Sequence, residues 1–150
     1  MATPVTGTDD RSLYWGDFHK HLTGHRRGRI ASNLNQAGEI IGHAKEHLDV
    51  YAPLCYPFEA YRIGRADGIG IETVGQRPQF EEWWDEIEKL SQEHLSSGEF
   101  VTFPAYEWHG NRTRWGDHNV VYFEEGYPLD DTRSLEELYG NLADRKAFAI

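Results

Sequence analysis

The chain of 150 residues has a single cysteine, Cys55. One cysteine cannot form a disulfide within the chain, which excludes a disulfide-stabilised scaffold and favours a reducing compartment such as the cytoplasm. No stretch approaches the ~20 apolar residues that a transmembrane helix needs, so we expect no membrane partner. Residues 1–12 contain neither a basic nor an apolar segment, and we therefore expect no signal peptide.

Basic residues are also few. The chain has 15 Lys and Arg against 25 Asp and Glu, a formal net charge of −10. Such a protein is not expected to bind nucleic acid nonspecifically through its overall field, although a local basic pocket is compatible with this balance. A hydrophobic fraction of 39% predicts a folded globular chain, the size of one domain or of half of a larger one.

The hydrophobic pattern predicts strands that alternate with helices, after a loosely ordered segment at residues 1–12. We expect strands at 12–21, 49–55, 99–107, 118–123 and 146–150, and helices at 35–48, 78–95 and 134–142. This order is typical of an α/β fold with a mostly parallel sheet. A buried strand at the extreme C-terminus predicts a chain that is cut before its fold is complete.

Three polar side chains recur at alternate positions near the end of the first predicted strand. Asp17, His19 and His21 have the spacing that places side chains on one face of a strand. The two imidazoles can therefore chelate one metal ion, and Asp17 can orient a ligand histidine. The alternative is a chance His-x-His on a solvated strand, because short motifs often match without function.

Further candidate ligands follow two later strands. Glu107 ends a hydrophobic strand before a glycine-containing turn, where its two carboxylate oxygens can bridge two divalent ions. The alternative is an exposed glutamate at a strand end. His118 opens the next strand, and the histidines with Glu107 fit Zn, Mn or Fe. His109, next to Glu107, is a candidate for substrate contact or proton transfer.

Arginines occur on both sides of these candidate ligands. Arg26 and Arg27 follow the first strand, and Arg112 and Arg114 follow Glu107. Clustered basic groups in an acidic protein suit an anionic substrate, most simply a phosphate. The alternative is ordinary solvated surface charge.

Three segments, LYWGDFHKH, FPAYEWHGN and GDHNVVYF, carry a resemblance to a known family. They are similar to the opening D-x-H-x-H motif, the glutamate motif and the following histidine-bearing strand of the PHP (polymerase and histidinol phosphatase) superfamily of metal-dependent phosphoesterases. The branch looks like the PHP-like domain of unknown function 3604 family. The resemblance covers residues 13–150 and implies the N-terminal half of a distorted (β/α)7 TIM-like barrel.

The resemblance also implies roles for single residues. His19 and His21 would bind the first metal, Glu107 would bridge metals, and His118 would complete another site, for one to three divalent ions. The chain departs from the family pattern at one motif. The family has T-D-H after the second strand, and this chain has Pro-Leu-Cys-Tyr-Pro there, at residues 53–57. Cys55 in that segment is either a replacement ligand or a buried structural cysteine.

We therefore expect a cytoplasmic metal-dependent hydrolase that acts on a small-molecule or anionic substrate. A phosphoesterase with a metal-activated water is the preferred reaction, with arginines taking the charge of the phosphoryl oxygens. One alternative is a hydrolase or lyase that acts on a non-phosphate bond with the same metal site. Another is a non-catalytic PHP-like module with a degenerate metal site, which the missing T-D-H motif favours.

Overall fold

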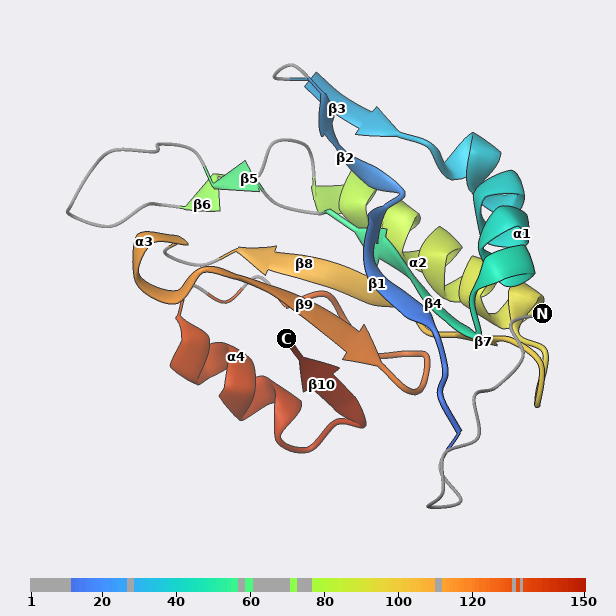
Figure 1. Ribbon diagram of the computed structural model, residues 1–150. Helices are drawn as coiled ribbons and strands as arrows, with labels where there is room; N and C mark the ends of the chain where they lie inside the picture. Colours follow the sequence, from blue (N-terminus) through green and yellow to red (C-terminus); the bar gives the residue numbers. More distant parts are fainter. Residues whose placement is uncertain are drawn as a thin grey trace.

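The computed structural model describes residues 12–26, 29–56, 59–60, 71–72, 77–109, 112–130, 132 and 134–150. Its centre is a six-stranded mixed sheet with the order β1-β4-β8-β9-β10, in which β7 also pairs with β4 (Figure 1). The strands of this sheet are β1 (Gly16–His21), β4 (Val50–Cys55), β7 (Val101–Thr102), β8 (Ala105–His109), β9 (Asp117–Tyr122) and β10 (Ala147–Ala149).

Two short antiparallel ladders lie outside the main sheet, and helices connect its strands. The ladders are β2 (Thr23–Arg26) with β3 (Arg29–Ser32), and β5 (Glu59–Ala60) with β6 (Ile71–Glu72). The helices are η1 (Leu34–Gln36), α1 (Ala37–His47), α2 (Arg77–His94), α3 (Arg112–Trp115) and α4 (Leu135–Leu142). Within the described residues, no helix combines the length and the apolar character needed to cross a membrane.

Helices α1, α2 and α4 form where their sequence patterns predict them, whereas the short α3 was not predicted. The apolar residues of α1 and α2 recur at helical spacing, and Ile41, Trp84, Ile87 and Leu90 are buried. Helix α4 begins with a capping box, in which the backbone N–H of Glu137 donates to the Ser134 side chain and the N–H of Ser134 donates to the Glu137 carboxylate. The mixed α/β class predicted from the sequence is therefore observed.

The sheet is mixed, with three parallel and two antiparallel pairings, and its antiparallel part was not predicted. Strand β4 pairs in parallel with β1, β7 and β8, but β9 runs antiparallel to both β8 and β10. Residues 110–116 are too few for the crossover of about a dozen residues that parallel neighbours need, so β8 and β9 form a hairpin. With β1 and β10 at opposite edges, the sheet of the described residues is open and is not a barrel.

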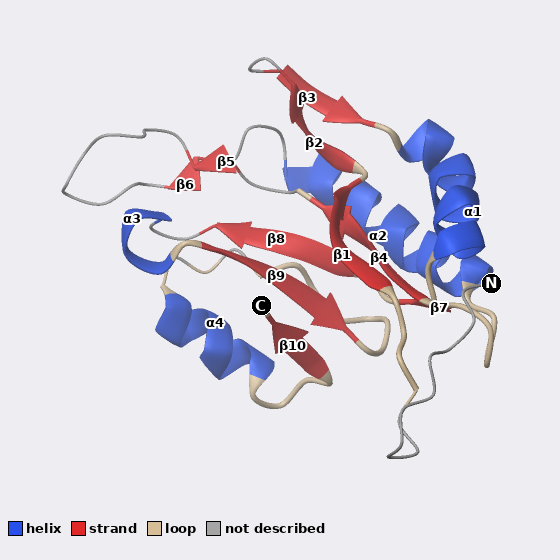
Figure 2. Ribbon diagram, in the orientation of Figure 1, coloured by secondary structure: helices blue, strands red, loops and turns tan. Residues whose placement is uncertain are grey.

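The two faces of the sheet have different coverings. Helices α1, α2 and α4, drawn in blue in Figure 2, contribute to one core cluster with alternate residues of the strands. They therefore cover the same face of the sheet. The opposite face carries a smaller apolar cluster to which no residue of a described helix belongs. Its members are Ala52, Leu54, Ala105 and Val121, with Phe18, Phe103 and Phe148 packed against them.

A buried carboxylate ties the C-terminal part to the sheet. The hydroxyl groups of Tyr106 and Tyr122 donate to Asp130 at 3.1 and 3.2 Å, and Arg145 forms an ion pair with the same carboxylate. Burial raises the pKa of Tyr122 to about 12, and the nearby Arg145 limits this increase.

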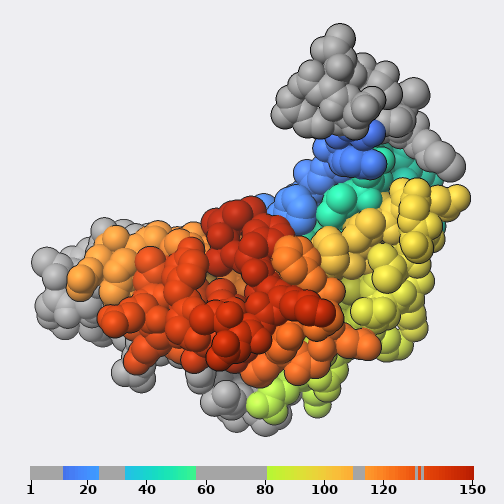
Figure 3. Space-filling model, turned by 90° about the horizontal axis from the view of Figure 1, so that it is seen from below, coloured from blue at the N-terminus to red at the C-terminus, as the bar shows by residue number. Residues whose placement is uncertain are grey.

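The C-terminal end of the chain lies at the surface. Figure 3 shows the last residues, in red, on the side seen from below, and Ile150 is 60% exposed.

Candidate metal centre

The two histidines of the His-x-His motif lie together at the end of β1. Their ring centroids are 4.9 Å apart. His21 pairs with Leu54 of β4, and Leu54 belongs to the cluster on the face opposite the helices. Because paired residues of parallel strands point to the same face and His19 alternates with His21, both imidazoles lie on the face that none of the described helices covers.

Asp17 does not share that face, which corrects the prediction for this residue. The register between β1 and β4 shifts between Asp17 and Lys20, and Asp17 pairs with Tyr51, which belongs to the core on the helix side. Its carboxylate accepts a hydrogen bond of 2.8 Å from the backbone N–H of His19. An extra residue in β1 thus reverses the alternation. Asp17 therefore stabilises the backbone of β1 at this register shift, and it does not contact the ring of either histidine.

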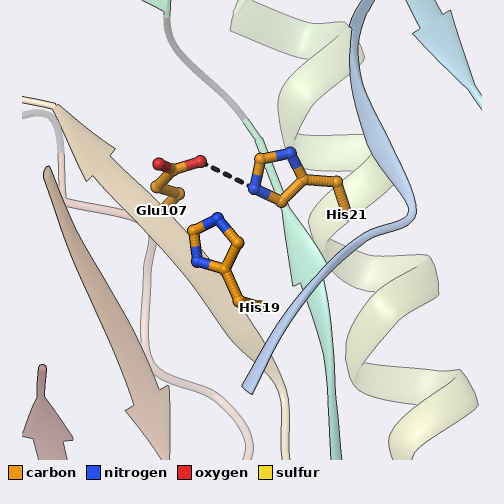
Figure 4. Close-up of side chains that lie close together, drawn as sticks. All are labelled: His19, His21 and Glu107. Atoms are coloured by element: carbon orange, nitrogen blue, oxygen red, sulfur yellow. Dashed lines mark ion pairs between the residues drawn. The ribbon is translucent and has the colours of Figure 1, made fainter. Parts of the chain in front are cut away.

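Glu107 lies on β8 beside these histidines and is only 4% exposed. Its Oε2 is 2.7 Å from Nε2 of His21 (Figure 4), and its Oε1 is 3.2 Å from Nε2 of His109. Burial on its own would raise the pKa of Glu107, but the neighbouring imidazoles of His109 and His21 bring it down to about 2. The two oxygens of one buried carboxylate therefore face two different imidazoles.

Two residues extend the group beyond Glu107. His109 is two residues further along β8 and is fully buried, and it pairs directly with Asp117 on β9. Its Nε2 is 3.9 Å from Oδ1 of Asp117. The sequence predicts His109 as a contact for the substrate or as a group for proton transfer, and the structure places its ring among the side chains that could also hold an ion. Asp117 was not predicted, although its position beside His118 at the start of β9 was the available signal.

His118 is the predicted ligand that the structure does not bring to this group. It pairs with Trp108, and its ring packs at 5.7 Å from the Trp108 ring. Its Nε2 is 3.0 Å from the backbone oxygen of Trp115. Because side chains alternate along a strand, His118 points to the helix side while Asp117 and Asn119 point to the side of Glu107.

Asn119 is a further member of the site that sequence reasoning missed. It pairs with Glu107 across the ladder between β8 and β9. Its side-chain amide lies 2.7 Å from Nδ1 of His19. An amide held on this ring nitrogen orients the imidazole and leaves Nε2 for a ligand. No local signal marks this role, because it depends on a contact between two distant strands.

The segment that replaces the expected T-D-H motif contributes Tyr56 to the site. Its ring lies 5.1 Å from the ring of His21 and 4.5 Å from that of His109, and it is 7% exposed. Cys55 is fully buried on the helix side, and the Thr23 hydroxyl donates to its sulfur at 3.4 Å. Burial raises the pKa of Cys55 to about 12. Cys55 is therefore a structural cysteine, and it is not among the candidate ligands.

Of the four arginines predicted to bind an anion, the structure describes the side chain of Arg114. Arg27 lies outside the described residues, and so do the side chains of Arg26 and Arg112. Arg114 is exposed, and its guanidinium lies 5.1 Å from the centre of the Trp115 ring. Its described contact is thus with Trp115, and a role in binding an anion stays a prediction for all four residues.

The ligand atoms form two triads that share one residue. His19, His21 and Glu107, the imidazole-rich triad, offer atoms that all lie within 4.8 Å of one another. The same is true of Glu107, His109 and Asp117, the carboxylate-rich triad. Imidazole and carboxylate groups suit Zn, Mn and Fe, so the chemistry of this group fits a divalent metal ion.

Comparisons with known proteins add no assignment. No family model matches the chain, and no curated protein or solved structure matches it.

Proposed function

We propose that the protein is a metal-dependent hydrolase whose primary ion binds to the imidazole-rich triad. The observation that carries this proposal is the convergence of His19, His21 and the buried Glu107 on one point (Figure 4). A buried carboxylate is costly to leave without a cationic partner, and a divalent ion would meet that need. Two imidazoles with a carboxylate form the ligand set of many catalytic zinc sites, which keep a further position open.

The residues around the triad have separate tasks in this proposal. Asn119 holds the ring of His19, and the ring of Tyr56 lies against His21. These contacts limit ring rotation and keep the two imidazoles in position. A bound divalent ion would supply an acidic water molecule and attract negative charge on the substrate.

A phosphate ester is the preferred substrate class. The support is the sequence, in which Arg26, Arg27, Arg112 and Arg114 occur close to the ligand motifs of an acidic chain. Guanidinium groups bind phosphate oxygens in pairs and would take the charge of the phosphoryl group. Membership of the PHP superfamily, completion of its barrel and a cytoplasmic location stay predictions.

A non-catalytic metal-binding module is the second candidate. The observation that favours it is the end of β4, where the last residue of the strand, Cys55, is buried and the next residue, Tyr56, lies against the imidazoles. Neither residue replaces the aspartate and histidine that the family motif supplies. Such a module would bind the ion without hydrolysing a substrate.

Elemental analysis combined with a panel of substrates distinguishes the hydrolase from the non-catalytic module. The metal-loaded protein is assayed on phosphate monoesters and diesters, with amide and glycoside substrates beside them. The proposal predicts a bound divalent ion and hydrolysis of phosphate esters that a chelator abolishes. Bound metal with no turnover would support the non-catalytic module, and hydrolysis of amides or glycosides alone would reject the phosphoesterase. A protein that binds no divalent ion would contradict the metal-dependent function altogether.

A further inference from the structure

We propose that Glu107, His109 and Asp117 form a second cation site that prefers a harder ion than the imidazole-rich triad, most simply Mn²⁺. This inference rests on the proposed function only for the shared Glu107, and it assigns His109 and Asp117 to a task that the sequence motifs do not imply. The two sites together would make the centre dinuclear, with chemically unequal halves.

The backbone brings the three ligands together without distortion of the sheet. Glu107 and His109 are alternate residues of β8, so they share a face. Asp117 lies directly opposite His109 in the antiparallel ladder, where paired side chains are neighbours. The site is thus built on two adjacent strands, whose regular pairing gives a firmer support than a loop.

The measured separations suit a small cation. His109 Nε2 lies 3.2 Å from Glu107 Oε1 and 3.9 Å from Asp117 Oδ1. Bonds of about 2.1 Å from an ion to each ligand would place neighbouring ligand atoms roughly 3 to 3.5 Å apart. The first separation already has this value. The second must close by a fraction of an ångström.

Burial and charge favour a cation at this position. The side chains of His109 and Glu107 are 0% and 5% exposed, and that of Asp117 is 21% exposed. Two carboxylates close to one imidazole in a largely desolvated place form a ligand set that suits a divalent ion. The partial exposure of Asp117 leaves an access from solvent.

The difference in ligands predicts the difference in metal. The imidazole-rich triad has two nitrogen ligands and one carboxylate, whereas the carboxylate-rich triad has one nitrogen ligand and two carboxylates. Imidazole suits zinc, and carboxylate oxygens suit harder ions such as manganese. Glu107 can serve both sites at once, because Oε2 faces His21 and Oε1 faces His109.

The experiment loads the two sites in sequence. The protein is stripped of metal with a chelator, given one equivalent of Zn²⁺, and then titrated with Mn²⁺ under electron paramagnetic resonance, which detects free and bound Mn²⁺. Zinc is added first because it binds more tightly than manganese to almost any protein site. Elemental analysis after desalting counts both metals. We expect one Zn²⁺ and one Mn²⁺ per chain.

Two near-isosteric variants test the ligands of the second site. Asp117→Asn and His109→Gln should each weaken Mn²⁺ binding by about 10-fold or more and leave the single Zn²⁺ in place. Asp144→Asn and His43→Gln are the matched controls, because both residues are exposed and lie outside the triads. Circular dichroism checks that each variant is folded. Should His109→Gln unfold, Asp117→Asn decides the matter, since Asp117 is partly exposed.

The outcomes separate the second site from the proposed function. Unchanged Mn²⁺ binding in Asp117→Asn overturns the second site. A wild-type protein that takes Zn²⁺ but no Mn²⁺ also overturns it and leaves the proposed function standing, provided that His19→Ala with His21→Ala removes the Zn²⁺. A protein that takes neither ion overturns both proposals.

Discussion

The side-chain amide of Asn119 lies 2.7 Å from Nδ1 of His19, a residue 100 positions away in the sequence. The contact joins β9 to β1 across the face that holds the two triads. An amide can present either its NH₂ group or its oxygen to the ring nitrogen after a half-turn. When Nε2 of His19 binds a metal, Nδ1 carries the proton and donates to the amide oxygen.

This contact makes Asn119 a positioning residue with a specific test. Asn119→Leu removes the partner of Nδ1 and should weaken Zn²⁺ binding at the imidazole-rich triad by about 10-fold. Asn119→Asp keeps an oxygen acceptor, so it should bind Zn²⁺ at least as well as the leucine variant does. Zinc titration of the stripped protein measures both. Equal affinities in wild type and the leucine variant would show that the amide does not orient His19.

His118 provides the opposite prediction. Its Nε2 contacts the backbone oxygen of Trp115 and its ring packs on Trp108, so it supports the core on the helix side. His118→Gln should leave the metal content unchanged and should lower the free energy of unfolding by about 1 kcal/mol. Elemental analysis and denaturant unfolding measure the two effects. Loss of a bound ion in this variant would restore the ligand role that the family motif implies.

The buried cysteine predicts a pH dependence of stability. Burial raises the pKa of Cys55 from 9.0 to about 12, so the unfolded chain loses this proton at lower pH than the folded chain does. Its contribution to stability is therefore complete below about pH 9 and is lost as the pH rises toward about 12. Denaturant unfolding at pH 9 and 10 should show a decrease that Cys55→Ala reduces. An identical pH slope in both proteins would contradict the assigned burial.

The same burial predicts low thiol reactivity. A disulfide reagent at pH 8 should leave Cys55 unmodified in the folded protein, because the thiolate is scarce and the sulfur has no exposure. Denatured protein, which exposes the thiol, is the positive control. Rapid modification without denaturant would place Cys55 at the surface.

Sequence reasoning identified the residues whose position depends on local pattern alone. Helices follow from apolar periodicity, and the positions of His19, His21 and Glu107 follow from their places near strand ends. The carboxylate of Glu107 lies between two imidazoles, and its bridging of two ions stays a prediction.

The remaining features depend on pairing between strands, which no local pattern specifies. The shift of register after Asp17 turns that side chain away from His21, and only the alignment of β1 with β4 reveals it. The face of His118 depends on where β9 begins, and one residue of difference reverses the side to which every side chain points. Asn119 and Tyr56 enter the site through contacts between distant segments.

The most direct test of the account is the metal content of Glu107→Gln, because this residue belongs to both triads. Glutamine keeps the shape of the side chain and removes its charge, and Glu136→Gln on the exposed side of α4 is the matched control. Each protein is stripped, loaded with Zn²⁺ and then Mn²⁺, and desalted before elemental analysis. The account predicts that wild type and control retain both ions, while Glu107→Gln binds each of them at least about 10-fold more weakly. Undiminished binding of both ions to a folded Glu107→Gln protein would contradict a centre built on this shared carboxylate.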